Sequence, residues 1–194
     1  MAENDTRTQI LDVAQEMIQR LGANAMSYQH IGDAVGIRKA SIHHHFPTKE
    51  NLLEALLKRY NTYFLGIVDG IISQEISASK KLAKYADLFE ATLCNGKNDK
   101  ACLCGMLGAE LASLGSASAE LVRTFYSENQ SELARILDEG LESGEFVFRG
   151  KSKATAALIF ALLEGAVLIA RAGGGQRQFK MIRNQLFTLL GRAA

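Results

Sequence analysis

The strongest constraint on the fold lies in residues 27–49, which read SYQHIGDAVGIRKASIHHHFPTK. Ser27 is suited to cap a helix at residues 28–35, because its side-chain oxygen can accept a bond from a free N–H group of the first turn. Gly36 stands where a chain leaving a helix usually needs positive φ, and Ile37 resumes the apolar pattern immediately. The sequence therefore predicts a helix followed by a tight turn.

A second helix is predicted at residues 38–45, and Pro47 ends it because a residue before proline avoids the α region. Its outward side chains can all form hydrogen bonds, and none is an acid: Arg38, Lys39, Ser41, His43, His44 and His45. An exposed face without a carboxylate indicates a polyanionic partner. Two helices that cross steeply through a short Gly-containing turn form a helix-turn-helix, whose second helix enters the DNA major groove. The alternative is the plain polar surface of a helical hairpin.

This stretch resembles the DNA-binding segment of the TetR family of transcriptional repressors. The residues that carry the resemblance are Ser27, Ile31-Gly32-x-x-Val35-Gly36-Ile37, Ser41-Ile42-His43-x-His45-Phe46 and Lys49-Glu50-x-Leu52, preceded by Ile10, Leu11, Ala14, Ile18 and Gly22. His43 and Ala40 depart from the residues usual in the family, which are Tyr at the first position and Gly or Pro at the second. The resemblance therefore implies DNA binding without implying a particular operator sequence.

Roles on DNA follow from helix geometry and from the resemblance. The free N–H groups at the start of the helix at residues 28–35 are placed to meet a phosphate, together with Ser27, Tyr28 and, from the next helix, Lys49. The resemblance implies backbone contacts for Ser41, His43 and His45. It implies base contacts for Gln29, Lys39, Ala40 and His43, because Lys pairs with guanine, Gln with adenine and Ala with a thymine methyl. Arg38 suits either task, and His44 shares the exposed face.

Apolar periodicity predicts helices along the rest of the chain. Their ranges are 5–21, 49–73, 80–94, 102–114, 118–143, 154–170 and 176–191. The fold class is therefore all-α with about nine helices, divided into a helix-turn-helix DNA-binding domain at 1–48 and a ligand-binding and dimerisation bundle at 49–194. The long helix after the helix-turn-helix can couple the two parts mechanically.

Composition agrees with a soluble, mostly helical protein, since 47% of the residues are hydrophobic, the formal net charge is +1 and there is one proline. In residues 1–50 five Lys and Arg face six acids, so attraction to nucleic acid must come from the placement of charge. No charged segment followed by an apolar run opens the chain, and we expect a cytoplasmic protein.

The segment at residues 154–170, ATAALIFALLEGAVLIA, is apolar on nearly every side. A membrane span needs about 20 apolar residues and disfavours a central acid such as Glu164, so no membrane partner is expected. A soluble helix of this kind must be covered on all sides, and a second copy of the chain is the expected cover. With the last helix it would build a four-helix homodimer interface, as in the TetR family, from Ala157, Ala161, Gly165, Phe179, Ile182, Leu186 and Leu190.

Neighbouring helical positions point about 100° apart, so the three consecutive histidines do not share a tetrahedral ion, and neither a metal nor a cofactor is predicted. Cys94, Cys102 and Cys104 are interpreted as small buried hydrophobes or as a thiol sensor in which Cys94 reaches one of the other two. All four histidines lie before residue 46, far in sequence from the thiols. A thiol-dependent enzyme therefore lacks a partner set, and the chain is not expected to be an enzyme.

In the family the effector pocket lies inside the C-terminal bundle. Candidates are Phe64, Phe89, Cys102, Met106, Glu110, Phe125, Tyr126 and Phe160, although such a stripe is more often plain core. If Glu110 or Glu164 lines a cavity, a cationic or hydrogen-bonding ligand is expected. The sequence thus predicts a ligand- or redox-responsive repressor that binds a palindromic double-stranded DNA operator as a homodimer and is released by a small-molecule effector. The alternatives are a thiol-dependent enzyme and a helical interaction module without DNA contact.

Overall fold

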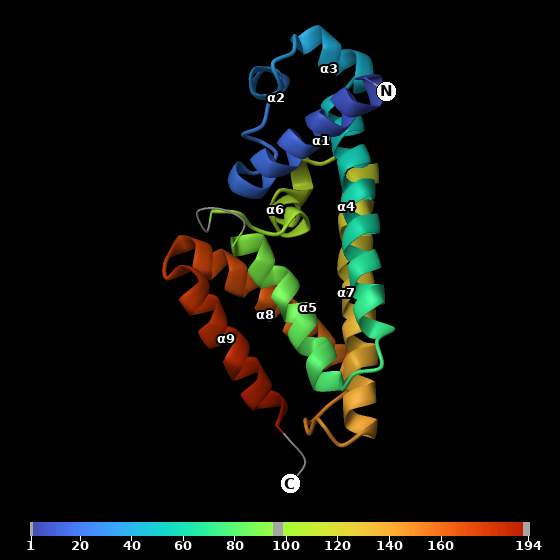
Figure 1. Cartoon of the computed structure of the whole chain (residues 1–194), viewed down its shortest axis with the longest axis vertical. Coiled ribbons are helices and arrows are strands. Elements are labelled where there is room, and N and C mark those ends of the chain that lie inside the picture. The colour runs from blue at the N-terminus through green and yellow to red at the C-terminus, as the bar shows by residue number, and fades with distance from the viewer. Residues whose placement is uncertain (1, 95–98, 192–194) are drawn as a thin grey trace. The chain divides into compact units, whose positions relative to one another are not determined.

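The chain is all-α in a computed structural model that describes residues 2–94 and 99–191 (Figure 1). Its helices are α1 (Ala2–Leu21), α2 (Tyr28–Val35), α3 (Lys39–His45), α4 (Lys49–Ile72), α5 (Ala78–Cys94), α6 (Leu103–Ala109), α7 (Ser116–Glu142), α8 (Ser152–Ala172) and α9 (Gly175–Leu190). The predicted all-α class is confirmed, and the described residues contain no β-strand. The helix expected at residues 102–114 is shorter, since α6 ends at Ala109 and a 3-10 turn, Leu111–Ser113, follows.

The chain divides into two compact units, each described here by itself. Unit 1 runs up to Tyr63 and also contains Leu103–Thr124, whereas unit 2 contains Phe64–Cys102 and the chain from Phe125 onward. The first parts of α4 and α7 therefore belong to unit 1, and the remainders belong to unit 2. The boundary predicted after residue 48 stays a prediction, and unit 1 contains α6 and helix segments from beyond it.

The core of unit 1 is built from the apolar stripes of its helices. Fully buried members are Ile10, Leu11, Ala14 and Ile18 of α1, Ile31 of α2, Ile42 of α3, and Leu52, Leu56 and Leu57 of α4. Their spacing at three, four and seven positions places each set on one helix face. Burial of each of these Ile and Leu side chains stabilises the unit by about 1.5–3 kcal/mol relative to exposure. This shared core fixes α1, α2 and α3 as one rigid reader.

Glu110, at the end of α6, attaches the α6 segment to the loop between α1 and α2. Its carboxylate accepts the Ala23 N–H at 2.7 Å and the Asn24 N–H at 3.2 Å. This position of the Glu110 carboxylate favours glycine at position 22. A Cβ there would lie 2.4 Å from Oε1 of Glu110, and the φ angle is +86°. A carboxylate that accepts backbone N–H groups forms charge-assisted hydrogen bonds, which are stronger than neutral ones.

Glu50, in the first turn of α4, caps the start of α7 in the same unit. Its carboxylate accepts the N–H groups of Gly115 at 3.1 Å and Ser118 at 3.3 Å, and the Ser118 hydroxyl at 2.6 Å. A Cβ on Gly115 would lie 2.5 Å from Cδ of Glu50. Negative charge is favourable at a helix N-terminus, where N–H groups lack partners. Two carboxylates therefore hold the α6–α7 segment and the reader together as one unit.

In unit 2, α8 packs against α5 and α9 through a buried face that includes Ile159, Phe160, Leu163 and Val167. By length and composition α8 could cross a membrane, although a core helix of a soluble protein passes the same test. Several large apolar side chains of α8 and α9 remain exposed: Leu158, Leu168, Ile169, Met181 and Leu189. The helix expected to be apolar on all sides is thus covered by its own chain on one side and uncovered on another.

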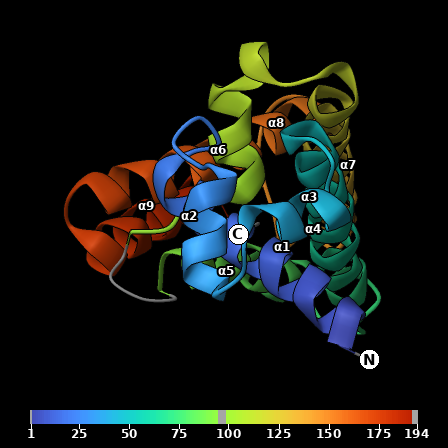
Figure 2. The same ribbon diagram turned by 90° about the horizontal axis from the view of Figure 1, so that it is seen from above.

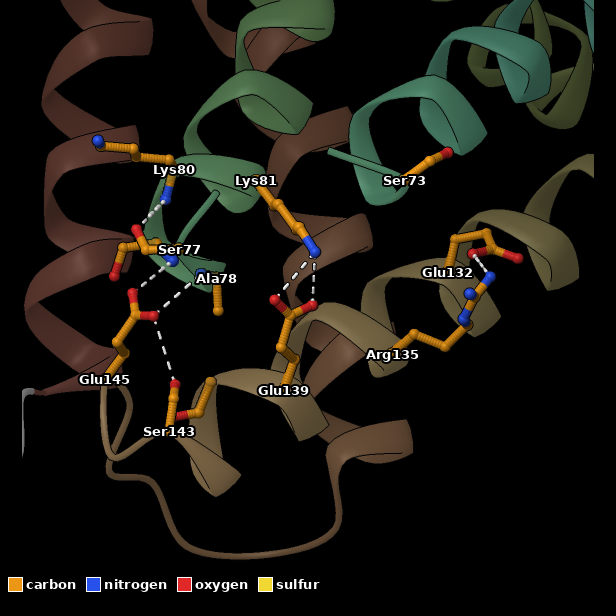
Figure 3. A network of polar contacts seen from close by, with 12 residues as sticks. Ser73, Ser77, Ala78, Lys80, Lys81, Glu132, Arg135, Glu139, Ser143 and Glu145 are labelled. Carbon is orange, nitrogen blue, oxygen red and sulfur yellow. Dashed lines mark hydrogen bonds and ion pairs between the residues drawn. The ribbon is translucent and has the colours of Figure 1, made fainter. Parts of the chain in front are cut away.

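A network of polar contacts surrounds the start of α5 in unit 2 (Figure 3). The Nζ of Lys81 lies 2.8 and 2.9 Å from the two carboxylate oxygens of Glu139 on α7. Glu145 accepts the N–H groups of Ala78 at 3.1 Å and Ser79 at 3.0 Å, which caps α5. The N–H bond from Ser79, supported by that from Ala78, lowers the pKa of Glu145 from its ordinary value.

The lowered pKa of Glu145 predicts a loss of stability in acid. A carboxylate whose pKa is lower in the folded state stabilises the fold above its unfolded pKa, and this contribution disappears as the pH falls through the folded value. We therefore expect the melting temperature of the wild type to approach that of Glu145→Gln as the pH falls below about 4.5. Thermal melts from pH 7 to pH 3 measure this convergence. The exposed neighbour Glu142→Gln is the control, and a constant gap between wild type and Glu145→Gln would contradict the account.

Candidate nucleic-acid interface

The turn between α2 and α3 forms as the residue types predict. Ser27 has extended backbone angles, and its side-chain oxygen accepts the His30 N–H at 3.2 Å, which confirms the helix cap. Gly36 adopts the left-handed region at φ 79°, and its N–H donates to the carbonyl of Gly32 at 2.8 Å. The Ile37 N–H donates to the same carbonyl at 3.0 Å. The turn between α2 and α3 therefore takes only residues 36–38, and the two helices cross steeply (Figures 1 and 2).

Gly32 is required by close approach rather than by its backbone angles. A Cβ at this position would lie 2.8 Å from the carbonyl oxygen of Ile37, a distance that real Cβ atoms essentially never show. Ile31 beside it is fully buried. The absence of a side chain at position 32 thus sets how closely the start of α3 approaches α2.

The inward side of α3 is anchored by Ile42, which is fully buried, and by Phe46, whose extended backbone ends the helix. Tyr28 completes this anchor. Its hydroxyl lies 2.8 Å from the carbonyl oxygen of Phe46 and 2.5 Å from that of Thr48, and it donates its one proton to them. Burial raises the pKa of Tyr28 to about 12. Main-chain acceptors therefore take the hydroxyl proton in the free protein, and the phosphate contact predicted for this hydroxyl stays a prediction.

The outward side of α3 presents the predicted face to solvent. Arg38, Lys39, Ala40, Ser41, His43 and His44 are exposed, and His45 is partly exposed. Two hollows flank the helix. One, of about 320 Å³, is lined by Met26, Ser27, Tyr28, Gln29, Lys39, His43 and Lys49. The other, of about 630 Å³, is lined by Thr6, Ile37, Ala40, Ser41, His44 and His45. The helix is therefore a ridge between two depressions.

All the predicted contact residues except Arg38 line one of these two hollows, and neither lining contains an acid. Asp33 lies outside both linings and accepts a bond from the side-chain amide of Gln29 at 2.7 Å. The cations Lys39 and Lys49 share one hollow, and His44 and His45 share the other. A concave surface with cations and no carboxylate favours phosphate oxygens.

His43 is oriented by two neighbours. Its Nδ1 lies 3.1 Å from the carbonyl oxygen of Pro47, and its ring makes an edge contact with Tyr28 at 4.8 Å between centroids. A carbonyl oxygen can only accept a hydrogen bond. The neutral His43 ring that makes this bond therefore carries its hydrogen on Nδ1, and Nε2 remains as an acceptor. An acceptor at the reading surface suits the amino groups of adenine or cytosine in the major groove.

Lys49 is partly withdrawn from the surface. Its Nζ donates to the carbonyl oxygens of Ala23 at 2.5 Å and Met26 at 3.0 Å, which fixes the loop before α2. An ammonium group has three donors, and one remains after these two bonds. Lys49 therefore has a structural role that the sequence did not indicate, in addition to the predicted phosphate contact.

Comparison with known proteins also indicates a DNA-binding regulator. The profile described as "Bacterial regulatory proteins, tetR family" matches residues 10–56. The HTH-type transcriptional repressor NemR of Escherichia coli is 25% identical over 189 residues, which cover 95% of this chain and 92% of NemR. The chain belongs to the TetR family of transcriptional regulators.

Solved structures of other TetR family proteins have the same fold. A regulator from Agrobacterium tumefaciens superimposes with a TM-score of 0.91 at 29% identity and covers 97% of this chain and 100% of its own. A regulator from Legionella pneumophila gives a TM-score of 0.83 at 29% identity and covers 94% and 96%. The similarity extends over nearly the whole length, whereas the residues behind the predicted resemblance lay in the first quarter.

The aromatic candidates for the effector pocket of this TetR family regulator do meet, within unit 2. Phe64 contacts Phe89 and Phe125 at 6.0 and 5.1 Å between ring centroids. Phe160 contacts Phe89 at 6.1 Å, Phe125 at 6.4 Å and Tyr126 at 5.4 Å. These five residues, here called the aromatic cluster, bring α4, α5, α7 and α8 together.

Two further pocket candidates of the TetR family regulator lie elsewhere. Glu110 and Met106 belong to unit 1, and the Glu110 carboxylate is bonded to backbone N–H groups of the α1–α2 loop. The structure thus gives Glu110 a positioning role in the reader, and its assignment to an effector pocket stays a prediction. No local signal revealed this role, since the two partners lie 86 and 87 positions away.

The cysteines of the TetR family regulator do not form one group in the described part of the chain. Cys102 and Cys104 are free and buried. Cys104 donates to Oδ1 of the buried Asn61 at 3.6 Å in unit 1, whereas Cys102 belongs to unit 2 and hydrogen-bonds to Glu164. The side chain of Cys94 lies outside the described residues. The buried interpretation holds for the two described thiols.

The predicted dimer residues of this TetR family regulator separate into two sets. Ala161 is exposed, and Ala157, Gly165 and Ile182 are partly exposed. Phe179, Leu186 and Leu190 are buried within the single chain, and Leu186 and Leu190 also line a hollow of about 510 Å³. Two exposed neighbours outside the predicted dimer set, Leu158 and Leu189, line the same hollow together with Ile159, Leu162 and the chain at 147–149. A dimer through α8 and α9 would cover the exposed Leu158 and Leu189 and this hollow.

Proposed function

We propose that this protein is a transcriptional repressor that binds a palindromic operator as a homodimer and leaves it when a small molecule binds. The observation that carries the proposal is the exposed, acid-free ridge of α3 between two hollows in a TetR family chain. A ridge one helix wide with donors on its outer side fits the major groove of B-DNA.

We assign direct base contacts to Lys39, Ala40 and His43, with Gln29 beside them. Lys39 can donate to guanine, Ala40 can contact a thymine methyl, and Nε2 of His43 can accept from an amino group. Phosphate contacts are assigned to Ser27, Arg38, Ser41, His44, His45 and the remaining donor of Lys49. The Gln29 amide donates one hydrogen to Asp33, and its second N–H and its carbonyl oxygen remain for a base edge.

The dimer is assigned to the uncovered face of α8 and α9. Leu158 and Leu189 are each 64% exposed, and Ala161 and Gly165 beside them would allow a close approach. An isologous pairing of this face would present two readers related by a twofold axis. Such a pair matches an inverted repeat with half-sites one helical turn, roughly 34 Å, or a multiple apart.

The effector is assigned to unit 2, around the aromatic cluster. A ligand that binds better to a conformation with wrongly spaced readers lowers operator affinity, because it shifts the population toward that conformation. The helices α4 and α7 each have residues in both units. A protein with this task works where the operator DNA is, which places it in the cytoplasm.

A gel-shift titration tests the proposal. The probe is DNA from the region upstream of the encoding gene, with an unrelated fragment of equal length as the control. We expect saturable binding to an inverted repeat with an affinity that falls steeply as salt rises, because phosphate contacts release counterions. Equal binding to both fragments, or no binding at low salt, would contradict the proposal.

Control of operator binding by an oxidant is the second candidate function, and the reactivity of the cysteine thiols tests it. Cys102 and Cys104 are both buried, which slows reaction because peroxide must reach a thiolate. We therefore expect mass spectrometry after mild peroxide to find both unmodified in the folded repressor, and operator binding to be retained. Rapid oxidation of either cysteine, together with loss of operator binding, would favour redox control over a small-molecule effector.

A further inference from the structure

Glu110 and Glu164 are the two acids that the sequence indicates as possible ligand contacts. Their carboxyl groups differ in their hydrogen-bond partners. Glu110 has backbone partners, whereas Glu164 on α8 does not have a full set. Its Oε1 is shielded from solvent and has no hydrogen-bond partner, and the Cys102 thiol bonds to the carboxyl group. A buried polar atom without a partner is costly and rare in native proteins. This oxygen therefore indicates a missing donor.

The surroundings of Glu164 have a regular arrangement. Tyr85 and Phe89 lie one turn apart on α5, Phe160 and Glu164 lie one turn apart on α8, and the two helices pack together. Phe89 contacts Phe160 at 6.1 Å and Tyr85 at 5.5 Å between ring centroids. Burial is the main cause that raises the pKa of Tyr85, and the negative charge of Glu164 adds to it, so the tyrosine and the carboxyl group are near one another. A carboxyl group thus stands beside aromatic rings.

The donor is not supplied by the neighbouring tyrosine. The Tyr85 hydroxyl donates to Oδ1 of Asn129 at 2.8 Å, and the Asn129 amide donates to the carbonyl of Phe125. This network is complete without Glu164. Burial also raises the pKa of Glu164 to about 7, so the charged form, which a cation would stabilise, is disfavoured in the free protein.

Glu164 lies partly at the surface of the single chain. Glu164 as a residue is partly exposed although its Oε1 is not, so its stem reaches the surface while its head turns inward. The next residue, Gly165, is also partly exposed and has no atom within 4 Å of where a Cβ would stand. Glu164 is therefore a residue near the surface of the single chain whose carboxyl oxygen Oε1 is turned inward.

We propose that Glu164 binds the ammonium group of an organic amine whose apolar body packs against the aromatic cluster. The amine must carry at least one N–H, because the unpartnered oxygen needs a proton donor. The aromatic rings accept the apolar body and favour a cation near their faces. The inference rests on the proposed effector-responsive function and names the ligand class of its unit 2 site.

Calorimetry on the purified full chain without DNA tests this binding. The probes are phenethylammonium, the neutral 2-phenylethanol and the anion 3-phenylpropionate, which share a phenyl body. We expect the ammonium probe to bind the wild type more tightly than the other two. Glu164→Gln, which keeps the shape and removes the charge, should weaken it about 10- to 100-fold.

The control Glu120→Gln removes a charge from an exposed side chain and should leave amine binding unchanged. Melting curves establish that both variants fold. Equal binding of the amine by Glu164→Gln, tighter binding of the anion than of the amine, or no amine binding by the wild type at millimolar concentration would each overturn the inference.

A gel shift separates this inference from the proposed function. Glu164→Gln should bind the operator as the wild type does, and the amine should release only the wild type. Amine binding by a protein that binds no operator would refute the repressor and leave the site standing. Operator binding that the amine does not change would leave the repressor standing and refute the amine as its effector.

Discussion

Lys39→Glu is expected to abolish specific operator binding and to leave the protein folded. Lys39 is exposed on α3 and lines the hollow that also contains Gln29, His43 and Lys49. A good base contact contributes about 1–3 kcal/mol, and a dimer makes it twice, so a loss of about 30- to 10,000-fold in operator affinity is expected. The reversed charge adds repulsion from phosphate. Gel-shift titration of wild type and variant on one operator fragment measures the change.

The matched control for this reversal is Lys58→Glu. Lys58 is an exposed lysine of α4 in the same unit, paired on the surface with Glu54 at 2.5 Å. It carries the same charge change but is absent from both hollows that flank α3. An affinity within a few-fold of the wild type is expected for it. Equal losses in the two variants would mean that bulk charge, not α3, governs the affinity.

Leu158→Glu is expected to convert the dimer into monomers and thereby to remove most of the operator affinity. Leu158 is exposed on α8 at the rim of the hollow that Leu189 also lines. A carboxylate buried there in each of two copies, close to the twofold axis, would be desolvated without a partner. A single reader loses the gain from simultaneous binding, which is about 100- to 10,000-fold.

Sedimentation velocity measures the oligomeric state, and gel shift measures the operator affinity of the same samples. Leu21→Glu is the control, because Leu21 is equally exposed but lies at the end of α1 in unit 1. It should stay dimeric. If Leu158→Glu stays dimeric at micromolar concentration, α8 and α9 do not form the interface.

The helix-turn-helix was predictable from sequence because its signals are local. Ser27 as the cap, Gly36 in the left-handed region and Ile42 as the buried anchor each follow from residue type and helix period. The inward hydroxyl of Tyr28 also had a signal, since Tyr28 lies three positions before the buried Ile31 and therefore shares its face. That phase argues for a core role rather than a phosphate contact.

Long-range contacts were not predictable in this way. The partners of Glu110 and Glu50 lie 65 to 87 positions away in sequence, and spacing gives no information about them. The stripe of α9 was recognised as apolar, but Phe179, Leu186 and Leu190 turn toward their own chain. Periodicity shows that a face will be covered, and only the tertiary structure shows what covers it.

The central claim is that α3 is presented twice, outward, by a symmetric pair of subunits. Hydroxyl-radical footprinting of the repressor on the fragment upstream of its gene tests this most directly. The account predicts two equivalent protected patches on an inverted repeat, separated by about one helical turn or a multiple of it and both erased in Lys39→Glu. A single patch, or a protected repeat that persists in Lys39→Glu, would contradict it.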